Sequence, residues 1–291
     1  MINAIEKNQS ISNRSIIGIY GQEFDSSLKN HLNKLKPAGI IIFTRNAISY
    51  KQLKDFISRI KDHLSDLIGF TPYICIDHEG GRINRLPFLE KLDSASDIGK
   101  LEKETEIISW IERLNEQLLD LGFNLNFAPC IDIFTNSNNK CLEGRCFSDD
   151  SEKVSRLTGI YIKKTKSMGL LTCAKHYPGL GSAGRDTHDE KALIDRSEEE
   201  LFTEELIPFK IAIKERVDFI MINHAIYPKI DHLPASLSPK LIKSMLREKL
   251  NFEGKIITDD LCMKGITNYF SKEECIQKAI DAGNDLLLVC H

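Results

Sequence analysis

The chain alternates between short apolar runs and longer segments in which apolar and polar residues mix. In the short runs the apolar residues are contiguous and often β-branched, which is typical of parallel strands that are covered on both faces. The pattern predicts eight strands, within residues 15–21, 39–44, 73–79, 125–132, 170–176, 218–225, 254–260 and 285–291.

The longer segments carry apolar residues at spacings of three and four, which predicts amphipathic helices. Asp25, Asp150 and Ser197 stand where N-caps are expected, and glycine follows several of the segments. The expected helices lie within residues 26–36, 49–64, 105–122, 151–169, 197–216, 238–250 and 272–283.

Eight strand–helix alternations in 291 residues indicate one α/β domain over residues 1–291, a single (β/α)8 barrel. A doubly wound open sheet is the alternative, but evenly spaced strands favour closure. The eighth strand runs to His291, so the covering helix after it is missing from the sequence. We expect the segment before Ser15, or a second copy in a homo-oligomer, to cover that face, because large apolar patches are rare on monomers.

Composition narrows the class of protein. The chain is 42% hydrophobic and 28% charged with a net charge of −3, which is ordinary for a soluble protein and predicts neither a nucleic-acid partner nor a membrane partner. The start, MINAIEKNQS, lacks the apolar stretch of a signal peptide. None of the eight cysteines forms a C-x-x-C pair. We therefore expect a cytoplasmic protein whose cysteines are buried apolar residues rather than metal ligands or disulfides.

Residues 175–190, KHYPGLGSAGRDTHDE, contain the glycine spacing of a dinucleotide-binding loop at Gly179, Gly181 and Gly184. Such a loop must open directly onto a helix, whose N-terminus holds the pyrophosphate. The residues that follow are charged and have no apolar period of 3.6 residues. We therefore interpret the glycines as a source of room and mobility for a loop that carries acid–base groups.

Polar residues gather where the predicted strands end. In a (β/α)8 barrel the functional residues come from these ends. Each residue alone has a simple structural explanation, as a helix cap or a satisfied core histidine, but their convergence on one rim predicts an active site. The residues are Asp77, Glu79, Arg82, Arg85, Asp132, Arg145, Lys175, His176, Asn223, His224, Asp259 and Asp260.

Several motifs resemble those of family 3 glycoside hydrolases, in particular the bacterial cytosolic β-N-acetylglucosaminidases of peptidoglycan recycling. They are IDHEGGRINRLP, GRCFSDD, KHYPGLGSAGRDTHD, NHAIYPKID, PASLSP and ITDDLCMKGI, in the family's order over nearly the whole chain. The resemblance implies a retaining hydrolase that removes terminal β-linked N-acetylglucosamine from saccharides such as muropeptides, with no cofactor and no metal.

Roles for individual residues follow from the same resemblance. Asp259 matches the catalytic nucleophile, which must attack the anomeric carbon in a retaining glycosidase. His188 matches the general acid and base, and Asp186 matches the residue that orients it. Leu180 departs from the family, which usually has a histidine there. The implied sugar-binding residues are Asp77, Arg85, Arg145, Lys175 and His176.

Other interpretations remain open at this point. A metal-dependent barrel hydrolase could use His176, His188, His224 and Asp259 as ligands, although no H-x-H pair occurs at a strand end. Lys175 could form a Schiff base. A sugar-binding homologue with weakened catalysis is the non-enzymatic alternative, and phosphate could replace water as the acceptor.

Overall fold

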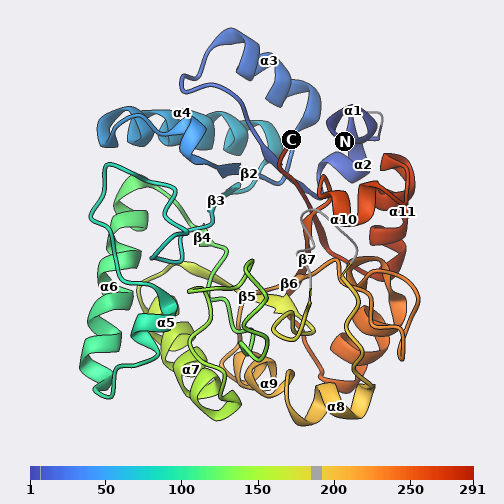
Figure 1. Ribbon diagram of the computed structural model, residues 1–291. Coiled ribbons are helices and arrows are strands. Elements are labelled where there is room, and N and C mark those ends of the chain that lie inside the picture. Colours follow the sequence, from blue (N-terminus) through green and yellow to red (C-terminus); the bar gives the residue numbers. More distant parts are fainter. Residues whose placement is uncertain (7, 185–191) are drawn as a thin grey trace.

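The computed structural model describes residues 1–6, 8–184 and 192–291. Its eight parallel strands pair in chain order, β1 with β2 through to β8, and β8 pairs with β1 to close the barrel. Figure 1 looks into this ring, with helices around it. The predicted barrel is confirmed. The strands are β1 Ser15–Gly18, β2 Gly39–Ile42, β3 Tyr73–Ile76, β4 Leu125–Asn126, β5 Leu171–Tyr177, β6 Phe219–Ile222, β7 Lys255–Asp260 and β8 Leu286–Val289.

The predicted helices are present, with two local differences. Segment 197–216 forms two helices rather than one, because Pro208 fits the first turn of a new helix but not a helix interior. Segment 238–250 forms a wide π-type helix, η3 Lys240–Lys249. The others are α3 Ser26–Leu35, α4 Tyr50–Ile68, α6 Glu104–Leu121, α7 Ser151–Ser167, α8 Glu198–Thr203, α9 Ile207–Lys214 and α11 Lys272–Ala282.

The predicted N-caps are confirmed. The side chains of Asp25, Asp150 and Ser197 accept hydrogen bonds from the backbone N–H groups of the first turns of α3, α7 and α8. Each cap satisfies a donor that has no partner within the helix. Short elements fill the loops: α5 Ala95–Ile98, α10 Lys264–Thr267, η1 Thr44–Asn46 and η2 Ala235–Leu237.

Two apolar clusters hold the barrel together. The smaller one lies inside the strand ring and includes Ile16, Cys75, Phe127, Phe219 and Ile257, while the larger one lies between the strands and the helices. All eight cysteines are free, and the expected burial is confirmed for all but Cys262. Among the residues that the structure describes, no helix is long and apolar enough to cross a membrane.

The N-terminal segment covers the face beside β8. This is one of the two expected possibilities, the other being a second copy of the chain. Its helices α1 Ile2–Ile5 and α2 Gln9–Ser12 lie next to α11 (Figure 1), and Met1 and Ile5 are buried. Arg14 anchors the segment, because its guanidinium donates hydrogen bonds to the backbone carbonyls of Asn284 and Asp285.

Candidate active site

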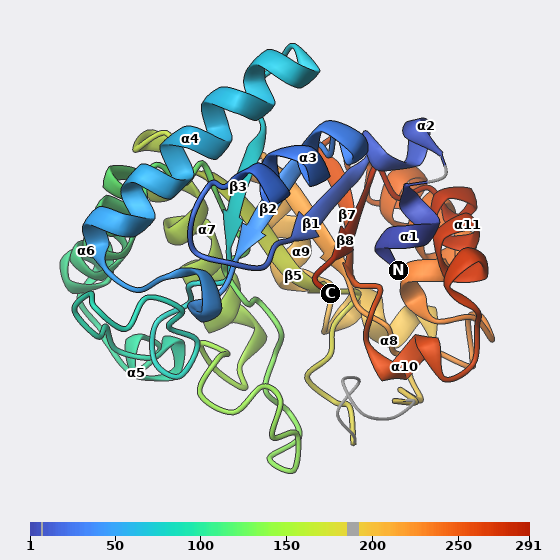
Figure 2. The ribbon, with the colours of Figure 1, turned by 90° about the horizontal axis from the view of Figure 1, so that it is seen from above.

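A cavity of about 480 Å³ opens at the carboxyl ends of the strands. Figure 2 shows the loops after β4 and β5, together with α5 and α10, on this side of the barrel. Asp186 and His188 lie outside the described residues. The structure brings the other six predicted site residues together in the wall of this cavity: Asp77, Arg85, Arg145, Lys175, His176 and Asp259.

Lys175, near the end of β5, supplies a buried positive charge. Its Nζ lies 2.7 Å from Asp77 Oδ1 and 2.7 Å from Glu79 Oε1, and its side chain is 2% exposed. Burial alone would lower the pKa of Lys175, but these two carboxylates outweigh it and hold the pKa above its ordinary value. A Schiff-base lysine must lose its proton. This environment therefore contradicts the Schiff-base interpretation.

Glu79 joins the lysine to an arginine. Its two carboxylate oxygens accept hydrogen bonds from Nε and one terminal nitrogen of Arg145, both at 2.8 Å. Burial alone would raise the pKa of Glu79, yet Arg145 and Lys175 hold it well below its ordinary value. The result is a buried, fully charged network under the cavity. Two bonds in parallel fix the guanidinium plane, so Arg145 enters the cavity in one orientation.

His176 extends this network. Its Nε2 lies 3.3 Å from an Arg145 terminal nitrogen, and its Nδ1 lies 2.6 Å from Asp132 Oδ2. Burial and the arginine both disfavour a charged imidazole. The Asp132 carboxylate nevertheless raises the pKa of His176 to about 9. The cavity therefore presents three cations, Lys175, Arg145 and His176, each held by a carboxylate.

Asp259 stands at the end of β7, on the cavity wall, and its Oδ1 accepts a hydrogen bond from the Asp260 N–H at 2.8 Å. Asp260 has a different position. Its Oδ1 accepts from the Cys262 and Cys290 N–H groups, both at 3.0 Å, and so ties the turn after β7 to the end of β8. Both aspartates therefore line the cavity, and Asp260 in addition stabilises the turn at its rim.

The glycines after β5 allow close packing, at least in the first half of the loop. A Cβ on Gly181 would lie 1.6 Å from the Ile133 carbonyl oxygen, and one on Gly179 would lie 2.7 Å from Glu205 Cβ. The Gly179 carbonyl also accepts a hydrogen bond from the Tyr227 hydroxyl at 2.6 Å. Gly179 and Gly181 therefore have a packing role, and the expected mobility of the loop stays a prediction. A Cβ on Gly184 would meet no atom within 4 Å among the residues that the structure describes.

The dinucleotide alternative also fails for this loop. Three of its backbone N–H groups serve internal partners: Leu180 N donates to Asp132 Oδ1 at 2.6 Å, Gly179 N donates to the His176 carbonyl at 2.9 Å, and Ala183 N donates to the Leu180 carbonyl at 3.1 Å. A phosphate cradle needs free N–H groups that point outward. The Leu180 side chain is 3% exposed and packs in the larger apolar cluster.

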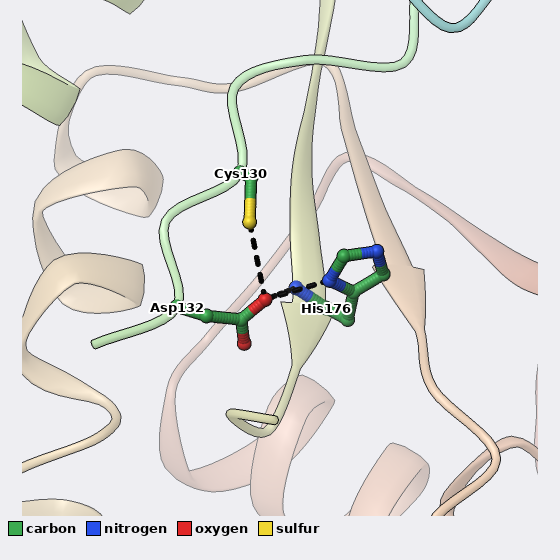
Figure 3. Close-up of side chains that lie close together, drawn as sticks. All are labelled: Cys130, Asp132 and His176. Atoms are coloured by element: carbon green, nitrogen blue, oxygen red, sulfur yellow. Dashed lines mark hydrogen bonds and ion pairs between the residues drawn. The ribbon is translucent and has the colours of Figure 1, made fainter. Parts of the chain in front are cut away.

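Cys130, Asp132 and His176 approach one another closely behind the cavity (Figure 3). One candidate ligand atom from each lies within 4.8 Å of the others, a spacing that could hold a metal ion. Asp132 Oδ2, however, already accepts a hydrogen bond from Cys130 Sγ at 3.3 Å. It also accepts hydrogen bonds from the backbone N–H of His176 and from the ring nitrogen Nδ1 of the same residue. These bonds account for the arrangement as a hydrogen-bonded unit.

The ligands of the metal-dependent alternative have separate partners where the structure describes them. His224 Nδ1 lies 2.7 Å from Ser236 Oγ, and its Nε2 lies 3.0 Å from the Asp260 carbonyl oxygen. His176 instead contacts Asp132 and Arg145. The two imidazoles therefore belong to different hydrogen-bond networks.

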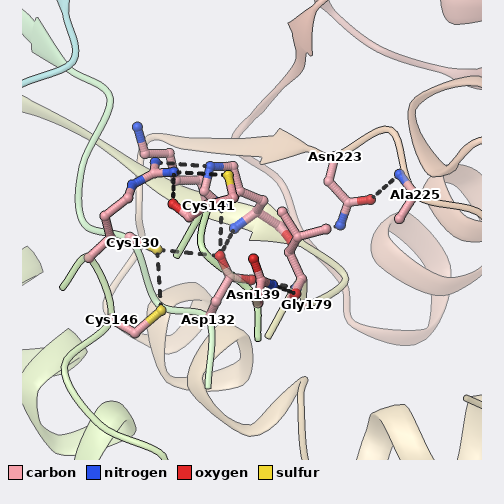
Figure 4. Close-up of polar contacts among 12 residues, drawn as sticks. Cys130, Asp132, Asn139, Cys141, Cys146, Gly179, Asn223 and Ala225 are labelled. Atoms are coloured by element: carbon pink, nitrogen blue, oxygen red, sulfur yellow. Dashed lines mark hydrogen bonds and ion pairs between the residues drawn. The ribbon is translucent and has the colours of Figure 1, made fainter. Parts of the chain in front are cut away.

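Sequence reasoning placed Glu79 and Asp132 at strand ends but gave neither a role in the site. Glu79 could have been found from Asp77, because residues two apart in an extended segment point to the same side. Asp132 gave no comparable local signal, because its partners His176 and Leu180 are 44 and 48 residues away in the chain. Figure 4 shows how these contacts join the segment after β4 to the loop after β5.

A closed barrel with a charged cavity of this kind is suited to a small, polar, hydroxyl-rich ligand. Comparison with known proteins identifies the class of protein. The chain belongs to glycosyl hydrolase family 3, because the model of that family's N-terminal domain matches residues 7–291. The fold and the family thus define a glycosidase.

Curated relatives and solved structures agree. The chain is 31% identical over 285 residues to a beta-hexosaminidase of Stenotrophomonas maltophilia, covering 95% of this chain and 83% of the relative. Identity to the beta-hexosaminidase of Psychromonas ingrahamii is 33% over 287 residues, covering 95% and 82%.

Two solved structures have the same fold over almost the whole chain. NagZ from Neisseria gonorrhoeae, in complex with N-trifluoroacetyl-D-glucosamine, superposes with a TM-score of 0.85 at 30% identity, over 96% of this chain and 81% of that one. A family 3 beta-N-acetylglucosaminidase from Paenibacillus superposes with a TM-score of 0.92 at 29% identity. The match covers 97% of this chain but only 54% of the Paenibacillus chain.

Proposed function

We propose that this protein is a retaining β-N-acetylhexosaminidase that removes terminal β-linked N-acetylglucosamine from saccharides. The observation that carries the proposal is the single cavity that joins Asp259 to the cations Arg145, Lys175 and His176. Relatives named beta-hexosaminidase and a neighbour bound to an N-acylglucosamine support the choice of sugar.

In the proposed reaction, Asp259 attacks the anomeric carbon while the leaving-group oxygen takes a proton from His188. The bond to the leaving sugar breaks and a glycosyl-enzyme ester forms on Asp259. His188 then removes a proton from water, which attacks the ester and releases the sugar with its original β configuration. Asp186 orients the His188 imidazole and raises its basicity.

The cations and Asp77 have a binding role in this scheme. Charged groups make stronger hydrogen bonds to sugar hydroxyls than neutral groups do. Lys175, Arg145 and His176 are held by Asp77, Glu79 and Asp132 before any ligand arrives, so little ordering is needed on binding. Arg85 lies on the same wall, with its guanidinium carbon 5.8 Å from the Phe43 ring centroid. We place the terminal sugar against these groups.

We propose muropeptides from peptidoglycan turnover as the natural substrates and the cytoplasm as the location. The support is the sequence resemblance to enzymes of that pathway. In this proposal residues 1–291 act as one barrel domain and need neither a cofactor nor a metal.

Turnover of an aryl N-acetyl-β-glucosaminide tests the activity, and NMR of the first-formed anomer tests retention. We expect hydrolysis that EDTA does not reduce, with the β anomer appearing first. The α anomer as first product would overturn the retaining mechanism. Loss of activity in EDTA, restored by a divalent metal, would favour the metal-dependent alternative. Binding without turnover would identify a sugar-binding homologue.

A further inference from the structure

We propose that Asp132 is a positioning residue for sugar recognition: it holds the His176 side chain in one orientation, with a proton on Nδ1, so that Nε2 faces the sugar. The proposal rests on the proposed function, in which His176 binds the sugar. Asp132 itself does not touch the ligand in this scheme, because its side chain is fully buried behind His176.

One carboxylate oxygen fixes His176 twice. Asp132 Oδ2 accepts hydrogen bonds from the backbone N–H of His176 at 3.1 Å and from its ring Nδ1 at 2.6 Å (Figure 3). The ring therefore cannot rotate about its side-chain bonds without breaking a short bond to a charged acceptor. Such bonds are among the strongest in proteins.

The second oxygen fixes the segment that follows. Asp132 Oδ1 accepts from Leu180 N at 2.6 Å, and Asn139 holds the Leu180 carbonyl at 2.9 Å. On the other side, the Asn223 side chain donates to the His176 carbonyl at 3.0 Å. The backbone from His176 to Leu180 is thus held by side chains from the segments after β4 and β6, and among these three side chains only Asp132 is charged.

The electrostatic surroundings give the carboxylate a second effect. Three groups face the imidazole: Asp132 and Cys130 from the segment after β4, and Arg145 from the loop beyond it. Lys175 precedes His176 on β5, but its ammonium group contacts Asp77 and Glu79. Burial and Arg145 favour the neutral ring, and Asp132 outweighs them, with a pKa of about 9 for His176. Without that carboxylate, burial and Arg145 favour the neutral ring, and only the contact with Cys130 acts in the other direction.

The sign of the expected pH effect follows from this balance. In the wild-type protein the Asp132 carboxylate keeps a proton on Nδ1 and raises the pKa of His176 to about 9, so the charged ring is favoured throughout the neutral range. Asp132→Asn removes the charge that favours the protonated ring, so we expect the protonated fraction of His176 to fall at pH 8 and to recover toward acid pH. The loss of affinity should therefore depend on pH, which a simple loosening of the fold would not produce.

The test compares the KM and kcat of Asp132→Asn with those of the wild-type protein, on an aryl N-acetyl-β-glucosaminide between pH 5 and pH 9. We expect the ratio of variant to wild-type KM to be about tenfold or more at pH 8, the effect of losing one hydrogen bond to a charged group, and to shrink toward pH 5. The ratio of kcat values should change less. An unchanged KM, or a KM ratio that is the same at every pH, would overturn the proposal.

Asp218→Asn is the matched control. Asp218 Oδ2 accepts hydrogen bonds from the backbone N–H of Thr172 at 2.9 Å and from its hydroxyl at 3.0 Å, at the opposite end of the same strand β5. This variant should loosen β5 without a pH-dependent KM. If its KM ratio also shrank toward pH 5, the effect would belong to the strand rather than to His176, and the proposal would be overturned.

A measurement without substrate separates this proposal from the proposed function. NMR of wild-type protein with ¹⁵N-labelled histidine reports the protonation of each His176 nitrogen, with His176→Gln used to assign the signals. A proton on Nδ1 across the neutral range supports the role of Asp132, even if the protein hydrolyses no glycoside or if Asp132→Asn does not fold. An imidazole protonated only on Nε2 at pH 7 would overturn it.

Discussion

Lys175 Nζ lies 2.7 Å from Asp77 Oδ1, although the two residues are 98 positions apart in the chain. The bond connects β5 to the end of β3 across the intervening strand β4. Since Glu79 holds the same ammonium group, the lysine bridges two carboxylates on one segment. The cavity is therefore built from charges that are already paired, and a ligand meets side chains with fixed directions.

The first prediction concerns the proposed nucleophile. Asp259→Asn should reduce turnover by about 10³-fold or more, because the covalent intermediate can no longer form. The melting temperature and the affinity for N-acetylglucosamine should stay close to wild type. Steady-state kinetics and calorimetry measure these quantities. Activity near the wild-type level would remove Asp259 from the role.

The second prediction concerns His188, whose importance should depend on the leaving group. A nitrophenolate departs without a proton, whereas a sugar alcohol must be protonated as the bond breaks. His188→Ala should therefore slow hydrolysis of a disaccharide far more than glycosylation by the nitrophenyl substrate. Asp186→Ala should show the same trend less strongly. Equal losses on both substrates would mean that His188 only binds sugar.

The third prediction concerns the buried pair of Glu79 and Arg145. Glu79→Gln leaves Arg145 and Lys175 with less compensation, and breaking a buried ion pair costs about 3–5 kcal/mol. We expect a loss of this size in the free energy of unfolding measured in urea. Glu90→Gln is the control, because its pair with Arg113 is exposed and should contribute about 1 kcal/mol or less. Similar losses in both variants would contradict the role of burial.

The fourth prediction is a pH dependence of stability. The pKa of His176 is raised from 6.5 to about 9 in the folded protein. A raised pKa contributes stability that is fully present below the unfolded value and is lost as the pH rises through the folded value. The melting temperature should therefore carry a decrease between about pH 6.5 and pH 9 that His176→Gln lacks. Parallel curves for the two proteins would show that His176 does not titrate in this window.

The fifth prediction separates packing from mobility in the glycine loop. Gly181→Ala places a methyl group against the Ile133 carbonyl, and overpacking of this kind costs about 1–3 kcal/mol. Gly184→Ala, whose methyl group would meet no atom within 4 Å in the described part of the chain, should leave the free energy of unfolding nearly unchanged. Urea denaturation of both variants decides the point. Equal stability of the two would mean that the loop shifts freely at both glycines.

The sequence predicted the barrel well because its signals are local. Each strand is a contiguous apolar run, and caps such as Asp25 and Ser197 mark where helices begin. The split between α8 and α9 was missed although Pro208 gave a local signal for it. Strand ends were also sufficient to bring Asp77, Arg85, Arg145, Lys175, His176 and Asp259 to one cavity, because the carboxyl ends of the strands in a closed barrel face the same side.

The interior of the site was harder to foresee. Glu79 and Asp132 act through partners that lie tens of residues away, and a sequence does not show which distant charges meet. The glycine loop illustrates a second difficulty. The structure shows that Gly181 is required because the Ile133 backbone approaches it closely. In the sequence alone, a glycine at this position is equally compatible with a flexible hinge.

The pairing of β1 with β8 has a consequence for how the protein is made. Ser15 to Ile17 lie in register with Leu287 to Val289, and Arg14 bonds to the carbonyl of Asp285, 271 positions later. While the chain is being synthesised, β1 therefore has one unpaired edge until nearly all of the described sequence is available. Exposed strand edges promote association between chains.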